Sequence, residues 1–444
     1  MNFQEENDKL LWNILQYFFR AWRNPEKKEY QNWSKLELDI NAYCNLKCKY
    51  CYYAKYGKKL MPPEACRVRD IRKNLKILLS FLEKNHYNPE IELFSGEALI
   101  QKIGLEVLEQ LVEHKGRLGG GTIVVPTNST FLLYPHLTKE VERILAKAKK
   151  LNVRVFLSHS VDGKYCESNR PFKRRYKKDP RDDKYWDRLF RFAKKYNFGF
   201  HPMIYSENIE KWKENFLWFQ ENFKKYGIPW TTLYLLEVRN AKWTSRQIIE
   251  LGKFLNFLVK WSWNKCGRDY SKFRTFLFQQ KGFNILNSVF SSIGRGLGCS
   301  IQSTLTVRLG DLAIYPCHRL SYSPFITGWF RTNGQTITGV RAHNVELFLA
   351  ILTLKGTCLP LCETCLIKEV CPKGCLGAQF ETTGDPFSPV PTICMMEHWK
   401  VLSILLALRE IGILEKILKE IDPLRRTELK CLIKIWEKVQ SRNS

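Results

Sequence analysis

The fifteen cysteines of this 444-residue chain are its most informative residues. Eleven lie in two stretches, Cys44 to Cys51 and Cys299 to Cys394. Structural disulfides are rare in a reducing compartment, so clustered cysteines there indicate metal ligands. We therefore expect metal centres in both stretches. Ordinary buried thiols are expected at the four isolated positions, Cys66, Cys166, Cys266 and Cys431.

The first stretch holds Cys44, Cys48 and Cys51, separated by three and then two residues. A tight loop of this spacing brings three sulfurs to one face, where they can hold three irons of a 4Fe–4S cube. The fourth iron then keeps an open position for a small chelating ligand, as catalytic metal sites do. A zinc loop is the alternative, but no fourth ligand of matching spacing follows before Cys66.

The second stretch contains a denser array. Cys362, Cys365, Cys371 and Cys375 are separated by two, five and three residues, and Cys394 follows at a distance. Pairs of cysteines two residues apart occur in both zinc and iron–sulfur sites, so a pair of zinc ribbons is the alternative. We favour iron–sulfur clusters, because zinc here would leave the first cluster without an electron route.

The elements that must position these cysteines alternate along the chain. From about residue 36, short β-rich runs are followed by amphipathic segments such as Ile71–Leu82, Val141–Lys150 and Ile209–Phe223. This alternation is typical of βα units around a parallel sheet. We predict an α/β protein with a partial barrel of six βα units, whose strands are Leu36–Ala42, Glu90–Phe94, Thr122–Pro126, Val153–Leu157, Phe198–Tyr205 and Thr231–Val238.

Four segments follow from this pattern. Residues 1–35 are predicted to be a helical extension with an aromatic-rich helix at Leu10–Trp22, and residues 36–290 the core barrel. The glycine-rich Gly294–Gly298 marks the start of a small, cysteine-rich and loop-rich domain at 291–400. Residues 401–444 are predicted to be a helical C-terminal segment.

The overall composition restricts the partners. Lys and Arg number 71 against 44 Asp and Glu, a formal net charge of +27, which attracts acidic peptides or nucleic acid. No window approaches the roughly 18 uninterrupted apolar residues of a membrane span. The N-terminal residues Met1–Glu6 are acidic and lack the features of a signal peptide. We expect a cytoplasmic protein with no membrane partner.

The first cysteine stretch resembles the fingerprint of the radical S-adenosylmethionine (SAM) superfamily, CxxxCxxC with an aromatic residue before the last cysteine, here Tyr50. The resemblance implies that Cys44, Cys48 and Cys51 bind a reducing 4Fe–4S cluster. It further implies that S-adenosylmethionine chelates the remaining iron. One electron then cleaves this cofactor, and the 5′-deoxyadenosyl radical takes a hydrogen atom from the substrate.

Three further segments resemble motifs of the same superfamily. Phe94–Leu99 is similar to its GGEPL segment, from which Ser95 and Ala98 depart, Thr127–Ser129 to its TNG, and Ser158–Gly163 to its S-x-DG. In barrel enzymes, chemistry gathers where such strands end. Arg170 follows as a partner for the cofactor carboxylate. The cofactor contacts implied by the resemblance are Tyr50, Ser95, Gly96, Glu97, Asn128, Ser160 and Arg170.

The second array resembles the SPASM domain, the auxiliary-cluster module of radical enzymes that modify peptides and proteins. Its inner spacing matches, whereas six residues separate Gly310 from Cys317 where the family usually has four. One of the implied auxiliary clusters has only three clear cysteine ligands. Either Cys358 supplies its fourth ligand, or its fourth position is open to substrate; both remain alternatives. The resemblance implies two auxiliary 4Fe–4S clusters, and so three clusters in all. One auxiliary cluster would be bound by Cys362, Cys365, Cys371 and Cys394. The other would be bound by Cys299, Cys317 and Cys375.

His318 is the candidate catalytic residue. It follows Cys317 where the branch that oxidises a serine or cysteine of sulfatases to formylglycine has an aspartate base. Histidine can take up a proton near neutral pH. The replacement nevertheless argues against the formylglycine reaction, and a packed histidine without chemistry is the alternative.

The sequence is compatible with three functions. The leading hypothesis is a maturase that forms a crosslink or an oxidised side chain in a peptide or protein, with the auxiliary clusters accepting an electron and a flavodoxin- or ferredoxin-type donor supplying one. The net charge and interleaved aromatics prompt a second, a radical SAM enzyme that modifies RNA or other nucleic acid. The third is a non-enzymatic iron–sulfur or zinc scaffold. The three-cysteine motif argues against it, because a carrier is better served by fully ligated clusters.

Overall fold

The computed structural model describes residues 3–24, 35–94, 96–174, 178–278, 283–290 and 299–443. The chain forms two compact units, each built from three separate stretches. The first unit comprises Met1–Val161, Arg170–Gly199 and Ser300–Thr353, and the second comprises Asp162–Asn169, Phe200–Cys299 and Leu354–Ser444. Both units therefore combine residues from either side of position 291, and the four segments expected from the sequence stay predictions.

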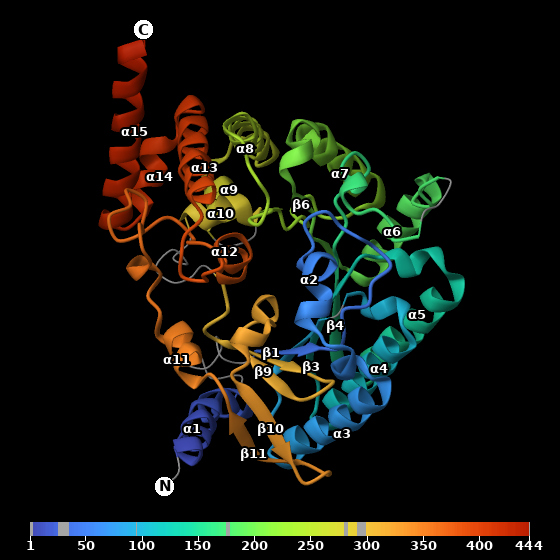
Figure 1. Ribbon diagram of the computed structural model, residues 1–444. Coiled ribbons are helices and arrows are strands. Elements are labelled where there is room, and N and C mark those ends of the chain that lie inside the picture. The colour runs from blue at the N-terminus through green and yellow to red at the C-terminus, as the bar shows by residue number, and fades with distance from the viewer. Residues whose placement is uncertain are drawn as a thin grey trace. The chain divides into compact units, whose positions relative to one another are not determined.

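A mixed sheet forms the centre of the first unit (Figure 1). Its strand order is β11-β10-β9-β8-β1-β2-β3-β4-β5. Strands β8, β1, β2, β3 and β4 are parallel, and β9 to β11 continue the sheet antiparallel. The strands are β1 (Lys35–Asp39), β2 (Glu90–Phe94), β3 (Gly121–Thr127), β4 (Val153–His159), β5 (Gly199–Phe200), β8 (Thr304–Arg308), β9 (Ala313–Tyr315), β10 (Gly328–Thr332) and β11 (Ile337–Ala342).

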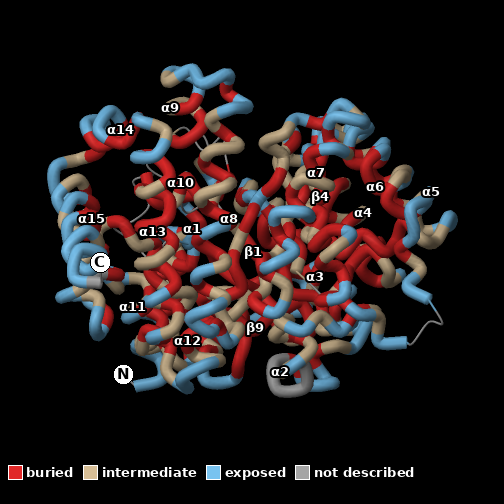
Figure 2. The backbone as a smooth tube through the Cα atoms, turned by 90° about the horizontal axis from the view of Figure 1, so that it is seen from above, coloured by how far each residue is buried: buried red, intermediate tan, exposed pale blue. Residues whose placement is uncertain are grey.

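The predicted parallel α/β fold is confirmed by this sheet. Along β4, burial alternates as the sequence pattern predicts, with Val153, Val155 and Leu157 more buried than the residues between them. Figure 2 shows β1 as a buried strand, since both of its faces are covered. The helices of this unit are α1 (Phe3–Arg23), α2 (Tyr52–Leu60), α3 (Val68–Lys84), α4 (Lys102–Arg117), α5 (Pro135–Lys150), α6 (Asp183–Tyr196) and α11 (Val345–Thr353).

The fifth and sixth predicted strands are shorter than expected. Phe198–Tyr205 contains Pro202, which has no backbone N–H for a sheet ladder. The extended structure is therefore divided between β5 and β6 (Met203–Ile204). In Thr231–Val238 only Leu236–Glu237 is a strand, β7, because the chain first makes a turn in which the Thr232 N–H donates to the Pro229 carbonyl at 3.0 Å.

The second unit is mainly helical, as predicted for the C-terminal region. Aromatic side chains form much of its core, with ring centroids 4.8 Å apart for Phe216 and Trp261 and 5.0 Å apart for Trp230 and Phe276. Its helices are α7 (Trp212–Tyr226), α8 (Ser245–Lys265), α9 (Tyr270–Phe278), α10 (Asn284–Phe290), α12 (Leu376–Thr383), α13 (Pro391–Glu410), α14 (Leu414–Glu420) and α15 (Pro423–Asn443).

One helix in the described part of the chain is long and apolar enough to cross a membrane. It is α13, and 61% of its most apolar 18-residue window is buried within the structure. A core helix of a soluble protein has the same length and composition, so this feature is weak evidence for a membrane span.

Candidate functional site

The three cysteines of the first stretch lie in one loop at the carboxyl end of β1, here called the cysteine loop (residues 41–51). Cys44, Cys48 and Cys51 are all half-buried. The Leu46 N–H donates to the Cys44 sulfur at 3.3 Å, and the Cys51 N–H donates to the Cys48 carbonyl at 3.1 Å. The fold of the loop therefore holds three thiols in one short segment beside the sheet edge.

Gly96 fixes the start of the cysteine loop. Its N–H donates to the Asn41 carbonyl at 2.9 Å, and the Glu97 N–H donates to the Tyr43 carbonyl at 2.8 Å. A Cβ at position 96 would lie 2.2 Å from the Tyr43 oxygen, closer than real contacts allow. The glycine is needed here for close backbone approach. Its neighbour Ser95, also expected to contact the cofactor, lies outside the described residues.

Glu97 holds the ends of two strands together. Its carboxylate accepts hydrogen bonds from the Thr127 hydroxyl at 2.9 Å, the Asn128 N–H at 2.5 Å and the Leu99 N–H at 3.1 Å. Burial raises the pKa of Glu97 to about 7, although the Asn128 and Thr127 hydrogen bonds oppose this rise. Three hydrogen bonds therefore fix the Glu97 carboxylate at the strand ends, and its contact with the cofactor stays a prediction.

Asn128 joins this network to the cysteine loop. Its side-chain amide donates to the Cys44 sulfur at 3.6 Å and to the Asn45 side-chain oxygen at 2.9 Å. Its own side-chain oxygen accepts hydrogen bonds from Thr130. The predicted site residue Asn128 therefore contacts the first cysteine directly.

The remaining predicted cofactor contacts belong to the first unit as well. The buried Arg170 donates from its guanidinium to the Tyr50 hydroxyl at 2.9 Å, and Tyr50 precedes Cys51 in the loop. The Ser160 N–H donates to the Thr127 carbonyl at 2.7 Å, which places Ser160 beside the end of β3. The structure thus collects these residues around the cysteine loop, at the carboxyl edge where barrel enzymes place their sites.

His159, at the end of β4, is buried and lies next to this edge. Its Nδ1 is 2.8 Å from the Ser129 hydroxyl, and burial lowers its pKa to about 3 from an ordinary 6.5. The unfolded chain therefore binds a proton between these pH values that the folded chain does not. We expect the unfolding free energy to fall as pH drops from about 6.5 toward 3, by up to about 1.4 kcal/mol per pH unit.

Urea unfolding across this range checks the expectation. His159→Gln removes the proton uptake and should flatten the profile. His136→Gln, at an exposed histidine of α5, should leave the profile unchanged. An identical pH slope in the wild type and the His159 variant would contradict the assignment.

His318 is paired with the buried Glu37. Its Nδ1 lies 3.2 Å from a Glu37 carboxylate oxygen, and its ring stacks on Phe94 with centroids 3.8 Å apart. Burial alone would lower its pKa, but Glu37 and Cys317 raise the pKa of His318 well above the ordinary value. His318 lowers the pKa of the buried Glu37 to about 2 against the effect of burial.

Cys317 completes a possible metal site in the same place. Its sulfur, the His318 imidazole and the Glu37 carboxylate all offer ligand atoms within 4.8 Å of one another. The Arg319 N–H donates to the Cys317 sulfur at 3.4 Å. Three donors of this type suit zinc or iron.

A second set of cysteines lines a pocket in the second unit. Burial and the neighbouring thiols Cys362 and Cys365 raise the pKa of Cys394 to about 11, so these three sulfurs lie close together. Cys371 is half-buried, and desolvation of its thiol raises its pKa to about 12. The pocket is lined by Cys362, Cys371, Cys375 and Cys394, and by Arg239, Lys373 and Glu397.

Several of these cysteine sulfurs accept the same kind of backbone hydrogen bond. The backbone N–H two residues after the cysteine donates to its sulfur at Cys44, Cys317, Cys365 and Cys371. Such bonds stabilise thiolates, the form that binds metal. Cys365 also lies 3.6 Å from the Nε2 of His398, whose Nδ1 is 2.9 Å from the Cys394 carbonyl. At Cys44 and Cys371 these hydrogen bonds oppose the effect of burial, which raises the pKa of Cys44 to about 11 and that of Cys371 to about 12.

The members of one predicted ligand group fall in different units. Cys317 lies in the first unit, whereas Cys299 and Cys375 lie in the second, so their common cluster stays a prediction. Cys358 is exposed in a short turn before the pocket cysteines. Of the four isolated cysteines, Cys166 and Cys266 are buried as predicted, whereas Cys66 and Cys431 are half-exposed.

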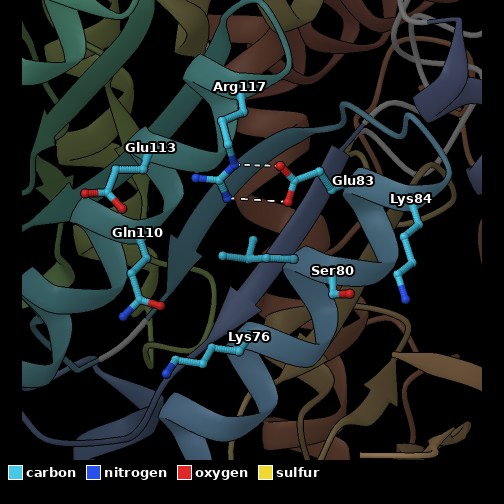
Figure 3. A pocket seen from close by; sticks show the side chains of 8 residues that line it. Lys76, Ser80, Glu83, Lys84, Gln110, Glu113 and Arg117 are labelled. Atoms are coloured by element: carbon cyan, nitrogen blue, oxygen red, sulfur yellow. Dashed lines mark hydrogen bonds and ion pairs between the residues drawn. The ribbon is translucent and has the colours of Figure 1, made fainter. Parts of the chain in front are cut away.

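A hollow of about 410 Å³ lies between α3 and α4 (Figure 3). Two of its charged groups pair with each other, since the Arg117 Nε donates to Glu83 at 2.5 Å. These residues are at the carboxyl ends of their helices, which lead back to the start of the next parallel strand. The hollow is therefore at the opposite edge of the sheet from the cysteine loop and adds nothing to the site.

Two functional features have no motif in the sequence. Glu37 lies in a buried strand whose other face carries Leu36 and Leu38. The alternation of charged and apolar residues in this strand is the sequence signal that could have indicated its position. Lys373 is 2% exposed with a left-handed φ of 59°, although it stands between Cys371 and Cys375 in a segment that reads as a loop. Its burial was not visible in the sequence.

Comparison with known proteins agrees with this geometry. A sequence profile described as the Radical SAM superfamily matches residues 39–219. No curated protein sequence matches the chain. Among solved structures, hexahistidine-tagged anSMEcpe with bound AdoMet is 16% identical, with a TM-score of 0.52, and the match covers 89% of this chain and 98% of that chain.

Two other solved structures give similar matches. Native anSMEcpe with bound AdoMet and the Cp18Cys peptide is 16% identical, with a TM-score of 0.50, over 86% of this chain and 99% of that chain. SuiB of Streptococcus suis bound to S-adenosylmethionine is 14% identical, with a TM-score of 0.43, over 81% of this chain and 75% of that chain. At such identities the likeness concerns the fold.

Proposed function

We propose that this chain is a radical SAM enzyme that modifies a peptide or protein by hydrogen abstraction; its residues 39–219 match the profile of the Radical SAM superfamily. The carrying observation is the loop of Cys44, Cys48 and Cys51 at the carboxyl edge of a parallel sheet, hydrogen-bonded to the ends of the next strands. Three thiolates leave one iron of a 4Fe–4S cluster open to S-adenosylmethionine.

The residues around the loop have distinct roles in this proposal. An iron–sulfur cluster bound by the three cysteines supplies the electron that cleaves S-adenosylmethionine to the 5′-deoxyadenosyl radical. Gly96 lets the backbone approach closely, and Glu97 holds Asn128 against the loop. The buried Arg170 offers a positive charge for the cofactor carboxylate. Ser160 and the undescribed Ser95 complete the proposed contacts.

We assign two auxiliary 4Fe–4S clusters to the remaining cysteines. The donor set fits the first of them, because Cys362, Cys371 and Cys394 line one pocket of the second unit and Cys365 lies near Cys394. The second would use Cys299, Cys317 and Cys375, with Cys358 or substrate at its open position. When bound, such clusters would supply an acceptor for the electron that the substrate radical loses as a crosslink or an oxidised side chain forms.

The substrate class rests on charge and on fold. The net charge of +27 favours an acidic peptide. The fold resembles that of anSMEcpe, which was solved with a bound peptide. His318 is the proposed acid–base residue, since it is paired with Glu37 beside Cys317. A flavodoxin- or ferredoxin-type donor in the cytoplasm would supply electrons.

Anaerobic reconstitution with iron and sulfide tests the proposal. We expect about twelve irons per chain, four for each of three clusters. Reduced protein given S-adenosylmethionine should release 5′-deoxyadenosine. The variant in which Cys44, Cys48 and Cys51 are alanine should hold about eight irons and release none.

Two results would contradict the proposal. Binding of zinc in place of iron would favour a scaffold. Full iron loading without release of 5′-deoxyadenosine would contradict the proposed radical reaction. Cys431→Ala, at an isolated cysteine, is the matched control and should behave like the wild type.

A further inference from the structure

The cysteine pocket of the second unit has positive charges in its wall that no proposed ligand role explains. Lys373 and Arg239 both line this pocket together with Cys362, Cys371 and Cys394. Lys373 is only 2% exposed, and the Arg239 side chain is 17% exposed. Buried charges are costly unless another charge compensates them, so their position beside thiols calls for a physical reason.

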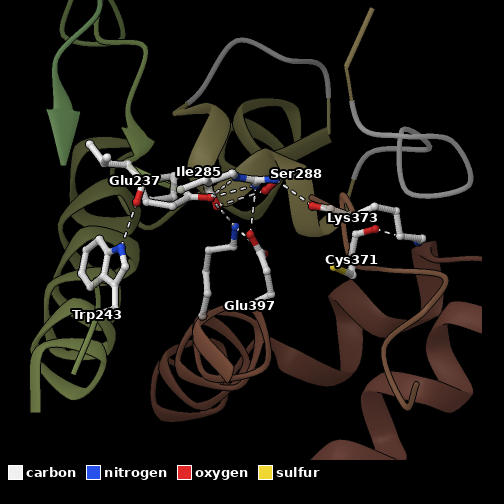
Figure 4. Close-up of polar contacts among 10 residues, drawn as sticks. Glu237, Trp243, Ile285, Ser288, Cys371, Lys373 and Glu397 are labelled. Atoms are coloured by element: carbon white, nitrogen blue, oxygen red, sulfur yellow. Dashed lines mark hydrogen bonds and ion pairs between the residues drawn. The ribbon is translucent and has the colours of Figure 1, made fainter. Parts of the chain in front are cut away.

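Lys373 is held in place from several sides. Its ammonium group donates to the carbonyls of Cys371, at 2.8 Å, and of Lys368. Its backbone N–H donates to the Cys371 sulfur, and its carbonyl accepts from Arg239 at 2.7 Å. Figure 4 shows Lys373 beside Cys371. Its φ of 59° is a conformation that glycine adopts without strain, yet the chain has a lysine there.

Arg239 is fixed by a compact network. Its guanidinium donates to Glu237 at 2.8 Å and to Glu397 at 2.9 Å. Lys400 lies 3.3 Å from Glu237 and 2.6 Å from Glu397. Two carboxylates and two cations balance one another, so the charge of Lys373 adds to a network that is neutral by itself.

We propose that Lys373, supported by Arg239, is the electrostatic counter-charge of the auxiliary cluster in this pocket and raises its reduction potential. A 4Fe–4S cluster with four thiolates is anionic and gains a further negative charge on reduction, and a fixed cation nearby favours the reduced form. Hydrogen bonds to sulfur act in the same direction, and the Lys373 N–H supplies one to Cys371. This inference rests on the proposed function, because it requires an iron–sulfur cluster at these cysteines.

The test compares Lys373→Met, Lys373→Arg and Lys434→Met in reconstituted full-length protein. Lys434 is an exposed lysine on α15 and serves as the matched control. Anaerobic redox titration followed by electron paramagnetic resonance gives the midpoint potential of each cluster, and iron analysis gives its occupancy. The cluster of the cysteine loop is an internal reference that should not shift.

Lys373→Met should lower the potential of one auxiliary cluster only, and Lys373→Arg should keep it near the wild-type value. Loss of about four irons in Lys373→Met alone would also support the counter-charge, because the cluster then needs it to assemble. Unchanged potentials in Lys373→Met, or equal losses in the Met and Arg variants, would overturn the inference. Wild-type protein without iron at this pocket would instead contradict the proposed function.

Discussion

Replacing Gly96 with alanine is expected to abolish iron uptake by the cysteine loop and with it the cleavage of S-adenosylmethionine. The new Cβ would lie 2.2 Å from the Tyr43 oxygen and 2.7 Å from the Ala42 oxygen, which are backbone atoms that cannot rotate away. The loop must therefore move, and with it Cys44, whose sulfur now meets Asn128. Iron per chain should fall by about four, and 5′-deoxyadenosine release should drop to the background.

Gly339→Ala is the matched control, because a Cβ at this position in β11 meets nothing within 4 Å. Far-ultraviolet circular dichroism should show that both variants keep their secondary structure. If Gly96→Ala binds as much iron as Gly339→Ala and cleaves the cofactor, the loop is more tolerant than its contacts indicate.

Replacing Lys400 with methionine is expected to destabilise the second unit strongly. Lys400 is 1% exposed and neutralises Glu237 and Glu397, which are also buried. Removing it leaves one cation, Arg239, for two buried carboxylates. Breaking a buried ion network in this way costs about 3–5 kcal/mol of unfolding free energy. Urea denaturation should show the transition of this unit moving to lower concentrations.

Lys434→Met removes an exposed lysine of α15 and should change the unfolding free energy by less than about 0.5 kcal/mol. A double variant, Lys400→Met with Glu397→Gln, should recover part of the lost stability, since it removes a lysine and a carboxylate together. If the single and the double variants are equally unstable, charge balance is not what this network provides.

The first four strands were predictable because their patterns are local. Burial alternates along β2, β3 and β4, and long amphipathic segments such as α5 lie between the strands. β8 was not predicted as a neighbour of β1, because its pairing partner lies far away in the sequence: Lys35 pairs with Thr304 and Asp39 with Arg308. No local pattern carries such information. The fifth strand is shorter than predicted, because Pro202 has no backbone N–H for the sheet ladder although the residues around it are β-rich.

The site was predictable where spacing alone defines it. The three cysteines of the loop and the inner cysteines of the second array follow from their intervals. The hydrogen bonds of Glu97 could not be predicted from the sequence, since a carboxylate after a strand can face a ligand or the protein. Only the structure shows its bonds to Thr127 and Asn128. The Glu37–His318 pair was hidden for the same reason, because its members come from distant segments.

The pairing of β1 with β8 has a consequence for biosynthesis. The sheet that carries the cysteine loop gains one neighbour of β1 early, from β2, but the other only when residues 304–308 have left the ribosome. Closing so long a stretch of chain is slow, and the partly formed sheet exposes an edge meanwhile. We expect Cys44, Cys48 and Cys51 to be more accessible to oxidation until this pairing is complete. Expression under low oxygen, with iron supply timed to the end of chain synthesis, should yield more loaded protein than repair after purification.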